Sequence, residues 1–186
     1  MILISTRQVP KSEQRSYAHS LLKLCLKEYG VDYDLGKPPV TFGEYGKPSL
    51  SEHPELHYNI SHADGIAAAM VSEYECGIDC ERVRRYRPSV FKRCYSDTER
   101  RDIETAPEAE RDLLFFKLWT LKEAYVKAIG KGLSVPLRNA VFSFNGDNII
   151  TELSGCTFSQ HVIDQEFVVS VCTLSDKIEP HIIRYL

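Results

Sequence analysis

Two acidic residues in the segment Gly77-Ile-Asp-Cys-Glu81 have a spacing that suits a metal ion. The pattern predicts a strand, and side chains two residues apart project from the same face of a strand, so Asp79 and Glu81 would lie side by side. Adjacent carboxylates repel each other unless a cation lies between them, and hard oxygen ligands suit Mg²⁺. A solvated charge pair on an edge strand is the commoner alternative, so this pair alone is only a candidate site.

A third carboxylate, Glu123, strengthens the metal interpretation. Trp119, Glu123 and Lys127 are spaced four residues apart, so in a helix they lie along one stripe. An exposed Glu–Lys pair at this spacing is common and contributes only about 0.3–0.5 kcal/mol. The only tryptophan of the chain lies on the same stripe, however, and a charged pair beside a large aromatic ring favours the wall of a cleft.

The polar segment Asn59-Ile-Ser-His62 is predicted to end a strand, where ligand-binding groups are often found. Ser61 could donate to a phosphate oxygen, and His62 could pair with a phosphate or transfer a proton. An ordinary polar turn is the alternative. A serine hydrolase is disfavoured because the serine and histidine are neighbours and the chain has no GxSxG motif.

Basic residues occur at two further places. Lys47, between Gly46 and Pro48, has a restrained backbone and could present its ammonium group to a phosphate, although an exposed turn lysine is the simpler interpretation. A cluster of six cations follows the acidic strand and is either a solvated face or a docking or phosphate-binding patch. It comprises Arg82, Arg84, Arg85, Arg87, Lys92 and Arg93.

The elements predicted to position these residues alternate between helices and strands. Ser12 is expected to cap a helix that runs to about Glu28, and residues 30–55 are expected to form turns. Capping boxes are predicted at Ser96–Glu99 and Thr105–Glu108, with a helix from there to Ile129 that Gly130 ends. Strands are predicted at 1–5, 56–60, 66–71, 77–81, 140–144, 148–153, 167–173 and 181–184.

The whole chain has the composition of a globular protein. It has 186 residues, 43% apolar and 26% charged, with a net charge of −3, which argues against a surface that binds nucleic acid throughout. Six cysteines without a CxxC pair are expected to be reduced packing residues. The apolar start, Met1 to Ile4, is too short for a signal peptide or a membrane span, so we expect a cytoplasmic protein.

The motifs occur in a distinctive order: YGKP, NISHAD, GIDCE and then FFKLWTLKEAYVKAIGKGL. Together they resemble the 4′-phosphopantetheinyl transferases of the surfactin-synthetase-activating type, over about Lys11 to Pro136. The resemblance implies an α+β fold of two pseudo-twofold duplicated halves, residues 1–95 and 96–186, each a small antiparallel sheet packed with a long helix. It also implies a monomer whose site lies where the halves meet.

The activity implied by the resemblance is Mg²⁺-dependent transfer of phosphopantetheine from coenzyme A, with Mn²⁺ as an alternative ion. The acceptor is a serine of an apo acyl or peptidyl carrier protein, and adenosine 3′,5′-bisphosphate is released. Neither nucleic acid nor a membrane is an expected partner.

By the same resemblance, each motif residue has an expected role. Asp79, Glu81 and Glu123 match the family's metal ligands, and Lys127 matches its helix lysine beside the reacting pyrophosphate. Lys47, Ser61 and His62 match coenzyme A contacts, with His62 near the 3′-phosphate. Lys11 and Arg15 are candidate 3′-phosphate ligands, a role for which His19 competes. Glu123 or a metal-bound water would accept the serine proton.

Two alternatives remain from the residues alone. A Mg²⁺-dependent nucleotide pyrophosphatase would use the same carboxylates with water in place of the serine. A catalytically silent module would bind coenzyme A or a carrier protein without turnover. The departures from the family pattern are small. Cys80 replaces a β-branched residue that is common there, and Ala63 replaces a frequent serine.

Overall fold

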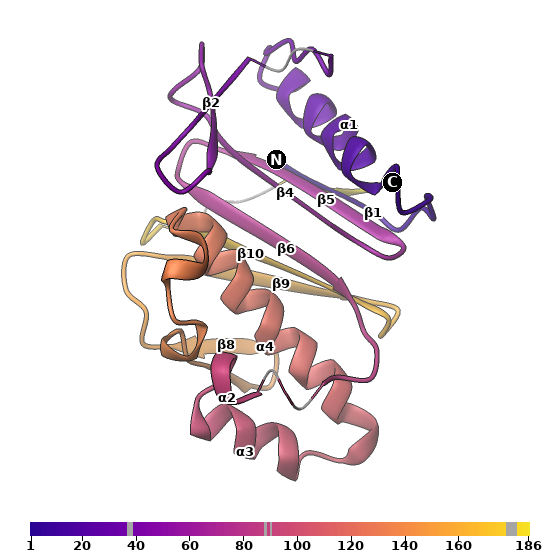
Figure 1. Ribbon diagram of the computed structural model, residues 1–186, viewed down its shortest axis with the longest axis vertical. Helices are drawn as coiled ribbons and strands as arrows, with labels where there is room; N and C mark the ends of the chain where they lie inside the picture. The colour runs from indigo at the N-terminus through magenta and orange to yellow at the C-terminus, as the bar shows by residue number, and fades with distance from the viewer. Residues whose placement is uncertain (37–38, 88, 90, 178–181) are drawn as a thin grey trace.

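The computed structural model describes residues 1–36, 39–87, 89, 91–177 and 182–186. Two small sheets lie face to face, and each carries a long helix on its outer side (Figure 1). The order of layers is therefore helix, sheet, sheet, helix. This confirms the predicted α+β class with small, mainly antiparallel sheets packed with helices.

The first sheet has the strand order β11-β1-β5-β4. It contains β1 (Ile2–Ser5), β4 (His57–Ala63), β5 (Ile66–Ser72) and β11 (Ile183–Tyr185), and all neighbours are antiparallel except β1 and β11. Helix α1 (Gln14–Lys27) covers its outer face. Alternate residues of β5 pack against α1 and against the second sheet, so both faces of the strand are buried. Burial on both faces explains the continuous apolar run in its sequence.

The second sheet has the order β6-β10-β9 and is antiparallel throughout. It consists of β6 (Cys76–Arg82), β10 (Phe167–Thr173) and β9 (Thr157–Ile163). Helix α4 (Glu108–Ile129) packs on its outer face, where it meets Val168 and Cys172. The opposite face meets the first sheet through residues such as Ile78, Val169 and Val171.

The two sheets exchange strands. β6 follows the β4–β5 hairpin along the chain but pairs with β10, and β11 follows the β9–β10 hairpin but pairs with β1. Each sheet therefore contains strands from both sides of residue 95. A division of the chain at that residue stays a prediction. The exchange has one clear consequence for the site. It places Asp79, on β6, in the sheet that α4 covers, although β6 directly follows the hairpin of the first sheet.

The remaining elements surround this core. A hairpin of β2 (Val40–Phe42) and β3 (Pro48–Leu50) lies in the region predicted to be turns. Helices α2 (Phe91–Cys94) and α3 (Asp97–Thr105) precede α4 (Figure 1). Two single-turn helices, η2 (Gly132–Ser134) and η3 (Leu137–Asn139), follow α4 and lead to the hairpin of β7 (Phe142–Asn145) and β8 (Asn148–Thr151).

The N-terminal ends of the helices confirm one of the three predicted caps and contradict the other two. The capping box at Ser96 and Glu99 is confirmed. Helix α1, in contrast, begins at Gln14 after Glu13, and no side chain caps it, so the predicted Ser12 cap is wrong. The second predicted box is also wrong, because the Thr105 hydroxyl donates back to a carbonyl of its own helix.

The strands were predicted less completely than the helices. Strand β9 was not predicted, and His181, the predicted start of the last strand, lies outside the described residues. Within the described part of the chain, no helix is long and apolar enough to cross a membrane.

Candidate active site

Strands β4 and β6 belong to different sheets and are joined by side chains. The Ile78 N–H donates to Asn59 Oδ1 at 3.0 Å, and the Cys80 N–H donates to Ser61 Oγ at 3.1 Å. The side chains of Asn59 and Ser61, two residues apart on β4, thus accept hydrogen bonds from two backbone N–H groups of β6. Without these partners, burying the two N–H groups would be costly. This joint places Ser61 directly beside Asp79.

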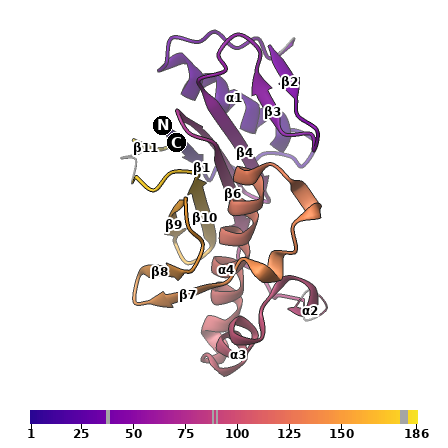
Figure 2. The same ribbon diagram turned by 90° about the vertical axis from the view of Figure 1, so that its left-hand side faces the viewer.

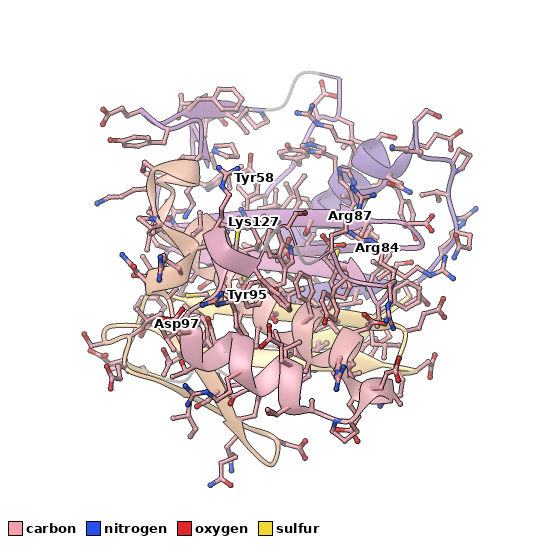
Figure 3. The ribbon with its side chains drawn as sticks, turned by 60° about the horizontal axis from the view of Figure 1, so that its bottom comes forward. Tyr58, Arg84, Arg87, Tyr95, Asp97 and Lys127 are labelled. Carbon is pink, nitrogen blue, oxygen red and sulfur yellow. The ribbon has the colours of Figure 1, made fainter. Side chains whose placement is uncertain are left out.

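Asp79, Ser61 and Lys127 form one hydrogen-bonded unit. Lys127 Nζ lies 2.7 Å from Asp79 Oδ1 and 3.1 Å from Ser61 Oγ, and it also donates to the Ile78 carbonyl at 3.0 Å. Ser61 Oγ donates to Asp79 Oδ1 at 3.0 Å. In Figure 3, Lys127 lies between Tyr58 of the first sheet and Tyr95. The unit therefore ties both sheets to α4.

Helix α4 reaches this position because it touches β6 backbone to backbone at Gly77. A Cβ atom there would lie only 2.1 Å from the Ala124 carbonyl oxygen and 2.4 Å from the Ala128 nitrogen. Only glycine allows so close an approach. The glycine of the GIDCE segment thus brings Glu123 and Lys127 to the acidic strand.

These elements enclose a cleft of about 710 Å³, which is within the usual range for cofactor sites. The polar part of its wall combines carboxylates with cationic groups, and the rest is largely aromatic and apolar. The lining residues are Arg15, His19, Tyr33, Val40, Phe42, Pro48, Tyr58, Asn59, Ile60, Ser61, His62, Asp79, Cys80, Glu81, Trp119, Glu123 and Lys127.

Most predicted site residues meet in this cleft. It brings together Asp79, Glu81, Glu123, Lys127, Ser61, His62 and Arg15, along with His19. The predicted stripe of Trp119, Glu123 and Lys127 is confirmed as one wall. Two predicted residues lie elsewhere: Lys11 is exposed in the turn before α1, and Lys47 binds the end of α4.

The site also contains residues that the sequence did not single out. Tyr33, Tyr58 and the β2–β3 hairpin supply much of its apolar wall. Alternation along β4 places Tyr58 on the same face as the predicted site residue His62, and this signal could have identified it. For Tyr33 and the hairpin, only the tertiary fold shows their place.

Burial and charge shift the pKa values of the ionisable groups in the cleft. Burial raises the pKa of Glu123, and the nearby charge of Asp79 adds to this effect. Burial also raises the pKa of Glu81, which Arg84 partly opposes through a hydrogen bond at 2.8 Å. Burial alone would lower the pKa of Lys127, but the charge and hydrogen bond of Asp79 outweigh it, and the pKa is raised.

The end of the cleft near α1 is lined by Arg15, His19 and His62. Burial lowers the pKa of His62, and the charges of Lys127 and Arg15 lower it further. The pKa of His19 is lowered by burial and then by Arg15 and His62. Because the lowered pKa values favour neutral imidazoles, Arg15 supplies the positive charge at this end. The two imidazole rings add nitrogen atoms that can form hydrogen bonds, so this end of the cleft suits an anionic ligand.

The acidic end of the cleft fits a hard divalent cation in its donor chemistry. Asp79 Oδ2 is buried and has no hydrogen-bond partner in the described part of the chain, while Glu81 and Glu123 face the same cleft. Among the described residues, no group of three aspartate, glutamate, histidine or cysteine side chains lies close enough together to hold a metal ion. Asp79 instead pairs with Lys127, and Glu81 pairs with Arg84. These side chains would have to turn towards an ion.

Comparison with known proteins places the chain in a family. Residues 75–172, more than half of the chain, match the model of the 4′-phosphopantetheinyl transferase superfamily. The matched segment contains β6, α4 and β10, and hence Asp79, Glu81, Glu123 and Lys127. The chain belongs to the 4′-phosphopantetheinyl transferase superfamily.

Individual relatives agree with this placement. A 4′-phosphopantetheinyl transferase of Bacillus subtilis is 32% identical over 153 residues, which cover 78% of this chain and 66% of the relative. The 4′-phosphopantetheinyl transferase Sfp of Bacillus subtilis strain 168 is 32% identical over 147 residues, covering 75% of this chain and 66% of Sfp. The chain thus spans just under two thirds of the length of these relatives.

A solved structure is also similar. The holo-[acyl-carrier-protein] synthase of Thermotoga maritima gives a TM-score of 0.47 at 22% identity, covering 56% of this chain and 64% of that one.

Proposed function

We propose that this chain transfers the 4′-phosphopantetheine group of coenzyme A to a serine of an apo acyl or peptidyl carrier protein and releases adenosine 3′,5′-bisphosphate. One observation carries the proposal. Within a family of such transferases, the cleft of this chain places Asp79, Glu81, Glu123 and Lys127 together and adds basic groups at its other end. A pyrophosphate with a further phosphate on the same molecule suits that distribution of charge.

In this proposal, Asp79, Glu81 and Glu123 would hold Mg²⁺, which suits their oxygen donors and the unpartnered Asp79 Oδ2. When bound, the ion would neutralise negative charge on the pyrophosphate as its bond breaks. Lys127 adds a fixed positive charge at the same wall. Its hydrogen bonds to Asp79 and Ser61 hold the ammonium group in place before substrate arrives.

The carrier serine must lose its proton to act as a nucleophile. Glu123, which lines the cleft, is the candidate acceptor of this chain, with a metal-bound water as the alternative. Arg15 and His62 bind the 3′-phosphate in this scheme, and the apolar wall around Tyr33 and Phe42 packs against the uncharged parts of coenzyme A.

A second groove adjoins the cleft and is the proposed docking face for the carrier protein. It has a volume of about 280 Å³ and shares Glu81 and Trp119 with the cleft. Its other lining residues are Arg84, Arg85, Tyr86, Arg87, Phe115 and Phe116. The labelled Arg84 and Arg87 lie to one side of Lys127 in Figure 3. Exposed arginines around an aromatic floor suit an acidic partner surface.

Several cations of the predicted basic cluster already have acidic partners within the chain. Arg84 pairs with Glu81 at 2.8 Å, and Arg85 lies 3.9 Å from Glu108, so both would exchange these partners on docking. Arg82 pairs within the chain with Asp64 at 2.9 Å and Glu166 at 2.5 Å, and the side chain of Lys92 lies outside the description. A monomeric state and a cytoplasmic location stay predictions.

Intact-mass spectrometry tests the proposal. The chain is incubated with coenzyme A, Mg²⁺ and a panel of apo carrier proteins. Transfer adds about 340 Da to a carrier, whereas a pyrophosphatase consumes coenzyme A without changing the carrier mass. A silent binding module does neither. Coenzyme A consumed or bound without any mass gain across the panel would refute transfer.

A variant pair tests the acidic end of the cleft. Asp79→Asn should abolish the mass gain while thermal unfolding stays cooperative, and removing Mg²⁺ with a chelator should do the same to the wild type. Asp64→Asn is the matched control, because Asp64 is an exposed carboxylate that pairs only with Arg82 in the described structure. Unchanged transfer by Asp79→Asn at saturating Mg²⁺ would contradict the metal assignment.

A further inference from the structure

Lys47 occupies a socket made by the chain itself. Its side chain is 16% exposed, and its ammonium group contacts three acceptors: the Ala128 carbonyl at 2.6 Å, the Cys76 carbonyl at 3.3 Å and the Glu75 carboxylate. An ammonium group has three N–H donors. All three are thus matched by protein acceptors, and none remains for a phosphate unless the socket opens.

The socket is shaped for the lysine stem as well as for its charge. A Cβ atom at Gly130 would lie 2.7 Å from Lys47 Cδ, so glycine leaves the space that the stem fills. The Ala128 carbonyl is one of the last carbonyls of α4, which lack partners within the helix. A cation at a helix C-terminus is also stabilised by the helix dipole.

The lysine connects two parts of the cleft wall that are far apart in sequence. It ends the turn of the β2–β3 hairpin, which is closed by hydrogen bonds from Gly43 N to Lys47 O and from Gly46 N to Gly43 O, both 2.9 Å. In Figures 1 and 2 this turn reaches towards the C-terminal end of α4. The same hairpin supplies Val40, Phe42 and Pro48 to the cleft.

A hairpin of this size needs such an attachment. Each of its strands has three residues and, within the described part of the chain, pairs only with the other strand. An isolated two-stranded hairpin is marginally stable in water. Leu50 is buried in the core between α1 and the first sheet, whereas Phe42 is 70% exposed. Lys47 is therefore the attachment of the turn end to the second sheet and α4.

We propose that Lys47 is a positioning residue, which clamps the β2–β3 hairpin to the end of α4 and so holds one wall of the coenzyme A cleft, rather than a phosphate ligand. The inference rests on the proposed function for its substrate. The family resemblance implies that Lys47 contacts a phosphate of coenzyme A, whereas its ammonium group in this structure is bound by acceptors of the chain itself.

Steady-state kinetics with coenzyme A, and with coenzyme A that lacks its 3′-phosphate, test the clamp. Lys47→Met keeps the stem and removes the ammonium group. We expect the KM for coenzyme A to rise about tenfold, or roughly 1.4 kcal/mol, with kcat within about twofold, because the reacting groups on β6 and α4 are not touched. The ratio of the KM of Lys47→Met to the KM of the wild type should be the same for coenzyme A that lacks its 3′-phosphate. A penalty that disappears with this substrate would show that Lys47 is a phosphate ligand and overturn the proposal.

A pair of glycine variants separates the clamp from any other ligand role. Gly130→Ala should displace the lysine stem and raise KM as Lys47→Met does. Gly132→Ala is the matched control, because Gly132 also has a positive φ (53° against 66°) but no described atom within 4 Å of the place where a Cβ would lie. If Lys47 bound any phosphate of coenzyme A, release from the socket by Gly130→Ala would leave KM unchanged or lower, and that result would refute the clamp.

Hydrogen exchange provides a test that does not depend on activity. Backbone amides of residues 40–50 should exchange faster in Lys47→Met and Gly130→Ala than in the wild type or in Gly132→Ala. If the wild type transfers nothing to any carrier, the proposed function fails, and exchange still decides the clamp. Unchanged exchange in both variants would overturn it.

Discussion

Gly77→Ala is the most direct test of how the site is assembled. The added methyl group would lie 2.1 Å from the Ala124 carbonyl oxygen, 2.4 Å from the Ala128 nitrogen and 3.0 Å from the Lys127 carbonyl carbon. All three are main-chain atoms of α4, so no change of side-chain rotamer can relieve the contact. The helix and the strand must move apart.

The size of this movement follows from the distances. Ordinary van der Waals contact of a Cβ atom begins near 3.4 Å, so the 2.1 Å contact requires a separation of about 1.3 Å. The Lys127–Asp79 hydrogen bond of 2.7 Å would then lengthen to about 4 Å and break. Overpacking of this kind costs about 1–3 kcal/mol, and a displacement of about 1 Å at reacting groups can cost about 100-fold in rate.

Transfer kinetics and thermal unfolding of the same samples measure both effects. We expect kcat/KM to fall about 100-fold and Tm to fall by about 2–4 °C per kcal/mol lost. Gly36→Ala is the control, because its nearest neighbour would be the Asp34 carboxylate at 3.4 Å on a flexible side chain. Wild-type rates in Gly77→Ala, with or without a lower Tm, would refute the argument that close approach of α4 aligns the site.

Two further predictions concern ionisable side chains away from the cleft. Glu99→Gln should lower the free energy of unfolding by about 3–5 kcal/mol in urea titrations, because it leaves the fully buried Lys122 ammonium group without its carboxylate partner at 2.8 Å; a loss below about 1 kcal/mol would contradict this. Burial lowers the pKa of His161, so the unfolded chain binds its proton more tightly, and stability is lost as pH falls below 6.5. His161→Leu should remove part of that loss between pH 8 and pH 5, and equal pH profiles would count against it.

Local pattern predicted much of the framework. The spacing of Trp119, Glu123 and Lys127 depends only on helical periodicity, and all three line the cleft. The capping box of Ser96 and Glu99 is also a short-range signal, and it forms as predicted. Such features are predictable because residues a few positions apart determine them.

Features that depend on distant partners were not predictable in this way. The sequence shows Lys47 between a glycine and a proline but not that its acceptors lie 28 to 81 residues further on. Strand β9 was missed because its residues are all half-buried and alternate weakly, and it is recognised only by its pairing with β10. In both cases the tertiary fold, rather than the local sequence, determines the structure.

The strand exchange explains why one cleft can use residues from the whole chain. Ser61 Oγ accepts from Cys80 N and Lys127 Nζ and donates to Asp79, so a single hydroxyl connects β4 of the first sheet, β6 of the second and α4. No one of these elements can present the site without the other two. A ligand that binds the cleft therefore binds only the chain in which both sheets are folded, and by mass action it stabilises them together.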